Sequence, residues 1–230
     1  MIGIIGAMEI ELDRLISNMK IEKKKKIAFL EFYIGTLYTK KVVLVKSNEG
    51  KVNSAVATQL LISNFDIDYV INVGIAGSIS EELNVFDVAI SKDTVEFDQD
   101  VSSLGYKIGY TFGINKVNIP VNIKLSNSLK KICDRLHFNS KIGTILTSDR
   151  FVTSKKEKDN LNKRFNGIAV DMESASINHV AYLNNIDFVA LRVISDNGNN
   201  IEYRKFAENA AENILKILKI YLEEEDLWKK

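Results

Sequence analysis

Carboxyl groups follow three apolar segments of this sequence, at the points where those segments end. Glu11 comes shortly after the first apolar segment, Glu173 follows Ile168 to Met172, and Asp196 follows Phe188 to Ile194. Carboxyl side chains act in enzymes as general acids and bases. If the segments are parallel strands of an open α/β sheet, their carboxyl ends share the edge where such sheets bind ligands. We therefore expect the three acids to converge, although each alone also fits the preference of acids for the positive end of a helix.

Glycines follow two further strand-like segments. Gly74-Ile75-Ala76-Gly77 comes after Tyr69 to Val73, and Ser47 to Lys51 separates a predicted strand from a predicted helix. Glycine lets the backbone approach a ligand closely, and the N-terminus of a helix offers N–H donors, but each segment also fits a tight turn. Gly3-Ile4-Ile5-Gly6 lacks the three-glycine spacing of dinucleotide-binding loops, and no phosphate-loop pattern occurs. The sequence therefore predicts no nucleotide cofactor.

The charges of the chain almost cancel. Its 230 residues include 31 Lys and Arg against 30 Asp and Glu, which gives a net charge of +1. Proteins that bind nucleic acid or membrane surfaces usually carry a basic excess, so neither partner is expected. With 46% hydrophobic residues and no linker or repeat, the chain predicts one compact domain over residues 1–230.

The chain has too few cysteines and histidines for a fold held together by disulfides or by a structural metal ion. The single Cys133 cannot form an internal disulfide, and His137 and His179 cannot build a structural zinc site with it. We expect no metal. The apolar start is interrupted by Glu9 before it reaches the length of a signal peptide, and no apolar run is long enough to span a membrane. These features predict a cytoplasmic protein.

Apolar runs alternate with amphipathic stretches, as expected of strands and helices in an α/β fold. The predicted strands are Ile2 to Ile5, Val42 to Lys46, Tyr69 to Val73, Val88 to Ser91, Ile142 to Leu146, Ile168 to Met172 and Phe188 to Ile194. Ile27 to Ile34 is predicted as a further strand that turns at Gly35, after a solvated turn at Lys23 to Lys26. The predicted helices are Glu9 to Met19, Val52 to Phe65, Ile123 to Leu136, Lys155 to Phe165, Glu173 to Leu183 and Tyr203 to Glu224. The irregular segment Asp98 to Ile119 fits a loop near a ligand or an ordinary surface excursion.

Four motifs in register resemble a known enzyme family. They are Gly3 to Glu11, Val73 to Gly77, Ala169 to Glu173 and Arg192 to Asp196. Their order and separations resemble the 5′-methylthioadenosine/S-adenosylhomocysteine nucleosidases of the nucleoside phosphorylase superfamily, over essentially the whole chain. The resemblance implies a single-domain three-layer α/β/α sandwich with a central twisted mixed β-sheet. It also implies a metal-free cytoplasmic homodimer that acts on adenine nucleosides without a cofactor.

The same resemblance implies a role for each acid. Asp196 would donate a proton to nitrogen seven of the purine, Glu11 would orient and deprotonate the attacking water, and Glu173 would bind the ribose hydroxyls. Cleavage passes through a cation-like sugar, so the enzyme must protonate the base, stabilise the sugar and deliver water. To act as the acid at neutral pH, Asp196 must have its pKa raised by burial or be protonated through its hydrogen bond to the base, whereas Glu11 must stay ionised.

Further positions match residues that surround the substrate in this family. Phe151 would stack on adenine, the backbone of Val152 would recognise the edge of the base, and Met172 would pack on the ribose. Ser195 would support the proton donor. Arg192 would orient the acids or contact the sugar region, or else balance the buried acids as a structural partner.

The pocket for the 5′-substituent is expected to combine both subunits. Met8 matches one of its apolar positions, and Tyr203 matches an aromatic residue near its mouth. Val101 and Leu104 match apolar positions that come from the partner subunit in this family. The Asp98 to Ile119 loop would then complete the neighbouring site, and activity would require the dimer.

The sequence also departs from the family pattern. Ile75, which precedes Ala76 and Gly77 in the substrate-binding segment, stands where a serine or threonine is common. Glu49 stands where an apolar residue commonly lines the ribose or 5′ region, and it either accepts a hydrogen bond from a 5′-hydroxyl or turns to solvent. Asp171 replaces a common glutamate.

Three other functions compete with this interpretation. A nucleoside phosphorylase would need a basic site for phosphate, which the glycine-containing loops lack. A futalosine hydrolase would differ mainly in the base and the group attached to ribose. A non-catalytic nucleoside-binding module would have no need for both a water-activating and a base-protonating acid.

Overall fold

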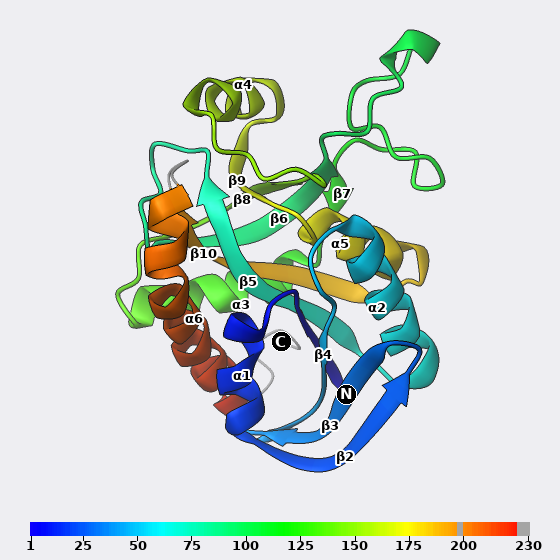
Figure 1. The fold of residues 1–230 in the computed structure, drawn as a ribbon, viewed down its shortest axis with the longest axis vertical. Coiled ribbons are helices and arrows are strands. Elements are labelled where there is room, and N and C mark those ends of the chain that lie inside the picture. The colour runs from blue at the N-terminus through cyan, green and yellow to red at the C-terminus, as the bar shows by residue number, and fades with distance from the viewer. Residues whose placement is uncertain (197–199, 225–230) are drawn as a thin grey trace.

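The structure is built on a mixed β-sheet with helices on both of its faces (Figure 1). The computed structural model describes residues 1–196 and 200–224, and for residues 200–205, 207 and 208 the backbone alone. The strands are β1 (Ile2–Gly6), β2 (Met19–Ile27), β3 (Leu30–Leu37), β4 (Lys40–Lys46), β5 (Tyr69–Ser78), β6 (Val88–Glu96), β7 (Ile119–Pro120), β8 (Ser140–Thr147), β9 (Gly167–Asp171) and β10 (Asp187–Asp196). The helices are α1 (Glu9–Ser17), α2 (Lys51–Asn64), α3 (Ile123–Arg135), α4 (Lys155–Phe165), α5 (Ser174–Leu183) and α6 (Asn200–Glu223).

The sheet is open on one side and closed on the other. Its open part runs from β5 through β1 and β4 to β3 and β2, with β1 parallel to both of its neighbours. Its closed part is a ring, because β5 pairs with β10 along most of its length and with β9 at Gly77 and Ser78, while β6 and β8 join β10 to β9. The ring brings the ends of β5, β9 and β10 together.

Helices cover the two faces as separate layers (Figure 1). One apolar core joins one sheet face to α1, α3 and α6, through side chains such as Leu15, Leu129 and Ile214. A second core joins the other face to α2 and α5, through Leu61 and Ile177. Because the two faces are both covered by apolar packing, the central strands are apolar on both sides. The predicted α/β class, with a central mixed sheet between helical layers, is confirmed.

Strand β5 is longer than its apolar run predicts. The segment Gly74-Ile75-Ala76-Gly77 does not form a turn after the strand, because it continues the strand to Ser78. Every residue of β5 is buried, and the glycine-containing half pairs with β10 on one side. The expectation of a glycine loop at this strand end was therefore wrong, and the site lies against extended backbone.

The first hairpin also differs from its prediction. Lys23 to Lys26 lie within β2, not in a solvated turn, and this strand pairs with β3 at the outer edge of the sheet. Lysines on an edge strand are compatible with pairing because their charges discourage a further strand from adding there. Gly35 is not the turn either. A Cβ there would lie 2.1 Å from the carbonyl oxygen of Lys20, so glycine allows close approach of β2 and β3.

The segment between β6 and β7 is largely irregular, as predicted, and projects from the body of the molecule (Figure 1). It contains the short 3-10 helix Ser102–Leu104. The rings of Tyr106, Tyr110 and Phe112 pack against one another, with centroids 4.6–5.3 Å apart. No helix within the described ranges is both long and apolar enough to cross a membrane.

Candidate active site

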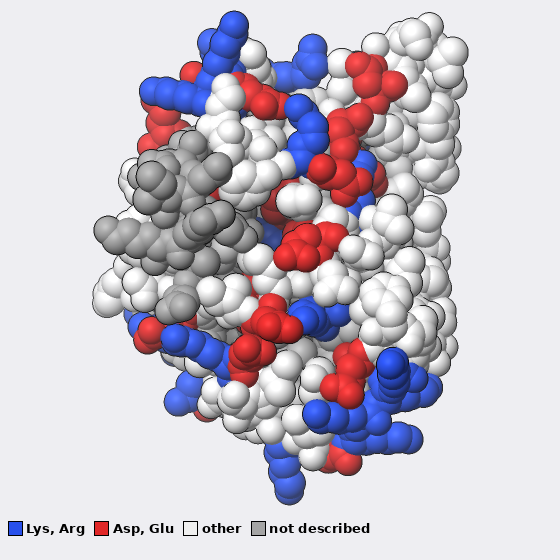
Figure 2. Space-filling view, viewed as in Figure 1, with Lys and Arg blue, Asp and Glu red and all other residues white. Residues whose placement is uncertain are grey.

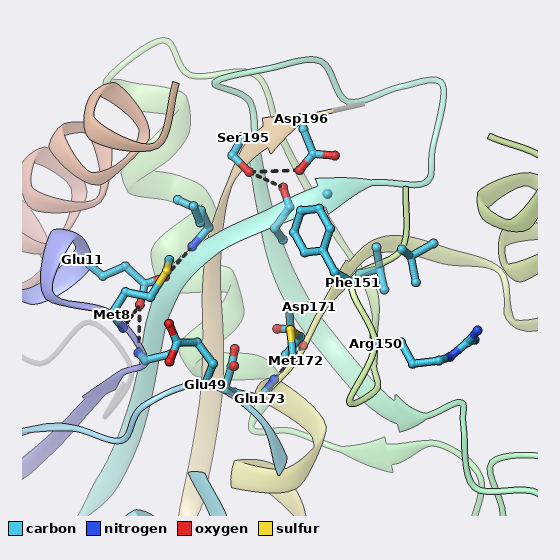
Figure 3. A pocket seen from close by; sticks show the side chains of 16 residues that line it. Met8, Glu11, Glu49, Arg150, Phe151, Asp171, Met172, Glu173, Ser195 and Asp196 are labelled. Atoms are coloured by element: carbon cyan, nitrogen blue, oxygen red, sulfur yellow. Dashed lines mark hydrogen bonds between the residues drawn. The ribbon is translucent and has the colours of Figure 1, made fainter. Parts of the chain in front are cut away.

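A pocket opens where β1, β5, β9 and β10 end at the same edge of the sheet (Figure 3). Its hollow measures about 550 Å³ out to the open mouth, within the usual range for small-molecule sites. The expected site residues that line it are Met8, Glu11, Glu49, Ile75, Ala76, Gly77, Phe151, Val152, Met172, Glu173, Ser195 and Asp196. Ala7, Arg150, Val170 and Asp171 complete the lining. The structure thus brings the three acids of distant sequence segments together.

Glu11 is fixed by backbone donors from two strand ends. It lies in the first turn of α1, and its Oε2 accepts hydrogen bonds from the N–H groups of Ala7 at 2.8 Å and Met8 at 3.0 Å. Its Oε1 accepts one from the N–H of Ile75 in β5 at 3.1 Å. Burial raises the pKa of Glu11, while Arg192 and these N–H groups act in the opposite direction. The result is a rigid, buried carboxyl group with increased proton affinity.

Arg192 lies behind the pocket wall and joins several of the acids. Its Nε donates to Asp171 Oδ2 at 2.8 Å, its Nη2 donates to Asn72, and its Nη2 lies 3.9 Å from Glu173 Oε2. Burial opposes the charge of the guanidinium, but the carboxylates of Asp171, Glu173 and Glu11 outweigh it and raise the pKa of Arg192. Arg192 does not line the pocket, so the structure favours its expected alternative as a charge-balancing partner.

Glu173 is the N-cap residue of α5, and its Oε1 accepts the N–H of Gly50 at 2.9 Å. Burial, followed by the nearby charge of Asp171, raises the pKa of Glu173 to about 8. The carboxyl group is therefore mainly protonated at neutral pH. A protonated carboxyl both donates and accepts hydrogen bonds, which suits a pair of hydroxyl groups.

Asp196 ends β10 on the far side of the pocket from Glu173 (Figure 3). Its Oδ2 lies 3.2 Å from the hydroxyl of Ser195, and that hydroxyl also reaches the carbonyl oxygen of Ala76 at 3.4 Å. Its Oδ1 lies 3.0 Å from Nζ of Lys158, which comes from α4. Glu11 and Asp196 are both buried, but backbone amides hold the first and an ammonium and a hydroxyl hold the second.

The walls between the acids are mostly apolar. Phe151 lies at the mouth, half exposed, and Val152 is buried beside it. Figure 3 shows the carboxylate of Glu49 turned into the pocket between Met8 and Glu173. Glu49 is also exposed, so its carboxylate faces the pocket and solvent together.

Two of the residues expected around the 5′-substituent lie away from this pocket. Val101 and Leu104 belong to the projecting segment between β6 and β7, and neither lines the pocket of its own chain. Tyr203 falls in α6, but its side chain lies outside the described part of the structure. If a second subunit completes the site, Val101 and Leu104 would line the pocket of the neighbouring chain and not that of their own.

The structure gives Asp171, Lys158 and Gly74 roles in the site that the sequence pattern does not predict. Asp171 orders the end of β9, because its Oδ1 accepts from the hydroxyl of Thr147 at 2.6 Å and its Oδ2 binds Arg192. Gly74 allows Glu11 and Arg192 to approach each other, since an added Cβ would lie 2.6 Å from one and 2.3 Å from the other. One feature of the sequence could have indicated that Lys158 is buried. It lies three residues before Leu161, which is buried, and so shares a face of the same helix with it.

Negative charge dominates the hollow. Figure 2 shows acidic side chains along the middle of the face that carries the site. Among the described residues, no group of three or more His, Cys, Asp or Glu side chains is arranged to hold a metal ion. The chemistry that this geometry supports is acid–base chemistry by carboxyl groups on a small molecule.

Comparisons with known proteins agree with this geometry. The family model described as Phosphorylase superfamily matches residues 1–223. The 5′-methylthioadenosine/S-adenosylhomocysteine nucleosidase of Staphylococcus aureus (strain bovine RF122 / ET3-1) is 36% identical over 219 residues, covering 92% of this chain and 94% of that protein. The crystal structure of the corresponding nucleosidase from Neisseria meningitidis, in complex with methylthio-immucillin-A, has a TM-score of 0.91 at 32% identity and covers 96% of this chain and 98% of its own.

A protein with a different named activity is also similar. The futalosine hydrolase of Helicobacter pylori strain 26695 has a TM-score of 0.89 at 29% identity, with 95% of each chain covered. The fold is therefore shared between two named hydrolase activities. Because the family model matches nearly the whole chain and a nucleosidase is 36% identical over most of it, the chain belongs to the phosphorylase superfamily and, within it, to the 5′-methylthioadenosine/S-adenosylhomocysteine nucleosidases.

Proposed function

We propose that the protein hydrolyses the N-glycosidic bond of 5′-methylthioadenosine and S-adenosylhomocysteine, and also that of 5′-deoxyadenosine. The products are adenine and the 5-substituted ribose. The observation that carries this proposal is the pair of buried carboxyl groups, Glu11 and Asp196, which line one pocket with different partners. Carboxyl groups in different environments can take the opposite roles of acid and base.

Each acid has one part in the reaction. Asp196 delivers a proton to nitrogen seven of the purine, so that the base leaves as a neutral molecule, and Ser195 holds its second oxygen. Glu11 orients a water molecule and accepts its proton as the water attacks the anomeric carbon. The raised pKa of Glu11 supports this role, because a more basic carboxylate takes up the proton more readily.

The remaining pocket residues bind the substrate. Glu173 contacts the ribose hydroxyls as both hydrogen-bond donor and acceptor. Met172 packs on the ribose, Phe151 stacks on adenine, and the backbone of Val152 recognises the edge of the base. Adenine lies against the β5 segment that includes Ala76 and Gly77, which is extended and buried.

Water is a better nucleophile for this pocket than phosphate. Glu11 and Glu49 line the hollow, and ionised carboxylates repel a phosphate dianion. Arg192 is bound to Asp171 and Asn72 behind the wall. Arg150, which lines the pocket, is paired with Glu157 at 2.7 Å. A phosphorylase would need a guanidinium or ammonium group free to hold the anion.

The products distinguish this function from its rivals. The protein is incubated with 5′-methylthioadenosine, S-adenosylhomocysteine, 5′-deoxyadenosine and futalosine, with and without phosphate, and the base and sugar are identified by chromatography. We expect adenine and the free 5-substituted ribose in both conditions. Ribose 1-phosphate products would identify a phosphorylase, base release from futalosine alone would identify a futalosine hydrolase, and no base release would leave a binding module. Glu11→Gln is the control, since it should bind substrate without turnover.

We also propose that residues 1–230 form one catalytic domain that works as a homodimer in the cytoplasm. Strands from both ends of the chain share one sheet, which supports a single domain. In the dimer, Val101 and Leu104 of one subunit reach the 5′-substituent pocket of the other, and Tyr203 lies near its mouth. The support for this arrangement is that the projecting segment leaves Leu104 70% exposed while the pocket of its own chain lies elsewhere.

A further inference from the structure

Lys158 is a buried lysine whose ammonium group lies against the proposed proton donor. Its Nζ is 3.0 Å from Asp196 Oδ1, and the side chains are only 4% and 3% exposed. Its neighbours Lys155 and Lys156 on the same helix are exposed to solvent. Burying a lysine costs several kcal/mol unless a partner compensates for its lost hydration, so this contact organises the local structure.

The backbone of β5 makes room for the contact. A Cβ on Gly77 would lie 2.9 Å from Nζ of Lys158 and 3.3 Å from Oδ1 of Asp196. The lysine therefore reaches the carboxylate across a position without a side chain. Ser195 contacts the other carboxylate oxygen, so Lys158 and Ser195 together fix the plane of the group.

The ion pair raises a question about the source of the proton. A carboxylate paired with an ammonium group carries no proton, yet the departing purine must receive one. One proton donor in contact with the carboxylate oxygen Oδ1 is Nζ of Lys158, at 3.0 Å. In a dry pocket an ion pair loses much of its advantage over the neutral amine and carboxylic acid, because both charges are poorly hydrated.

We propose that Lys158 is a positioning residue that supplies, through Asp196, the proton taken up by the leaving purine. This inference rests on the proposed nucleosidase function. An N–H bond of the ammonium group breaks as an O–H bond forms on Asp196, and that proton then moves to the purine nitrogen as the bond from the sugar to the base breaks. Lys158 is left as a neutral amine and regains a proton from water, while Glu11 takes the proton of the attacking water and later releases it to solvent.

A leaving group that needs no proton gives the sharpest test. The substrates are 5′-methylthioadenosine and the 5-methylthioriboside of p-nitrophenol, whose leaving group departs as a stable anion. We expect Lys158→Met to lower kcat for 5′-methylthioadenosine about 100-fold, the usual lower range for loss of acid catalysis. The same variant should hydrolyse the nitrophenyl riboside within about threefold of the wild-type rate. Lys156→Met, on the exposed side of α4, should match the wild type with both substrates.

A second variant separates proton supply from charge. Lys158→Arg keeps a cation and hydrogen-bond donors but holds its proton too tightly to release it, so its rate with 5′-methylthioadenosine should stay low. Full recovery with arginine would overturn the proposal, as would equal losses with both substrates or no loss with the adenine nucleoside. Failure of the wild-type protein to release adenine would instead overturn the proposed function, independently of Lys158.

Discussion

Arg192 is surrounded by more carboxyl groups than its charge can balance. Asp171 binds it at 2.8 Å, Glu173 lies 3.9 Å away, and Glu11 also raises the pKa of the guanidinium. One positive charge cannot compensate several buried negative charges, so the protein relieves the repulsion by keeping a proton on one of them. Burial and the nearby charge of Asp171 raise the pKa of Glu173 to about 8, so this carboxyl group keeps a proton at neutral pH.

This proton predicts how stability depends on pH. The pKa of Glu173 is about 8 in the folded protein against an ordinary value of 4.5. Its contribution to stability is therefore fully present below pH 4.5 and is lost as the pH rises through 8. Glu173→Gln keeps the neutral form at every pH, so its melting temperature should gain on the wild type between pH 5.5 and 8.5 by on the order of 5 °C. Thermal unfolding at both pH values measures this gain, and a constant difference would contradict it.

The position of Glu49 predicts which group the enzyme accepts at the 5′ carbon of the substrate. Its carboxylate turns into the pocket (Figure 3), where it can accept a hydrogen bond from the 5′-hydroxyl of adenosine. Glu49→Ile should lower kcat/KM for adenosine about tenfold relative to 5′-methylthioadenosine, because a hydrogen bond to a charged group contributes about 1.5 kcal/mol or more. Glu49→Gln keeps an acceptor and is the matched control. An unchanged ratio in the isoleucine variant would show that Glu49 does not contact this hydroxyl.

The convergence of Glu11 and Asp196 follows from the strand pattern, but the positions of Glu173 and Lys158 do not. Strands β1 and β10 are both parallel to β5, so acids that follow their carboxyl ends share one edge of the sheet. Glu173 follows β9, which pairs antiparallel with β5, and it reaches the same pocket only because the sheet closes there. Lys158 is one of several lysines on a polar helix, and its burial depends on how α4 packs over β9 and β10. That packing is a tertiary contact between segments 38 residues apart, and no local spacing encodes it.

At the scale of elements, β5 is the wall on which both halves of the site depend. Gly74 lies between Glu11 and Arg192, and Gly77 lies between Lys158 and Asp196. A strand with side chains at these positions would separate the groups. The two glycines therefore serve close approach across an extended strand, where the sequence suggested a turn.

Gly74→Ala tests this role. The added Cβ would lie 2.3 Å from Nη1 of Arg192 and 2.6 Å from Oε1 of Glu11, so at least one of them must move. Displacement of a catalytic group by about 1 Å costs roughly 100-fold in rate, and we expect kcat to fall by that factor with 5′-methylthioadenosine. Circular dichroism should show an intact fold. A variant with wild-type kcat would show that Glu11 does not need its present position.

The strand pattern predicted most elements but could not predict how the sheet closes. The apolar segments identified β1, β4, β6, β8, β9 and β10 to within a few residues at most of their ends. The ring forms because β5 continues past its apolar run and pairs with β9 at Gly77 and Ser78. Periodicity reports which residues are buried, whereas this pairing depends on the twist of the whole sheet.

At the scale of the whole molecule, one edge carries exposed apolar side chains. They belong to α2, α5 and the projecting segment, and they are Val52, Val56, Leu104, Tyr106, Phe112 and Leu183. Figure 2 shows few charged side chains along the right-hand edge, where α2 and the projecting segment lie in Figure 1. Monomeric proteins rarely expose large contiguous apolar surfaces. This edge is therefore the surface that we expect a second copy of the chain to cover.

If the subunits share their sites, two different defective subunits should restore each other. Leu104→Ala should raise KM for 5′-methylthioadenosine about fivefold to tenfold by removing an apolar contact from the neighbouring pocket, while Glu11→Gln should be inactive. The two variants are unfolded and refolded together, with Glu11→Gln in excess, so that mixed dimers form. In a mixed dimer the pocket that retains Glu11 receives Leu104 from the Glu11→Gln subunit. The KM of the mixture should therefore return to the wild-type value. The double variant Glu11→Gln/Leu104→Ala is the control, because it supplies no leucine and should restore nothing. A mixture that keeps the KM of Leu104→Ala alone would show that Leu104 acts within its own subunit or not at all.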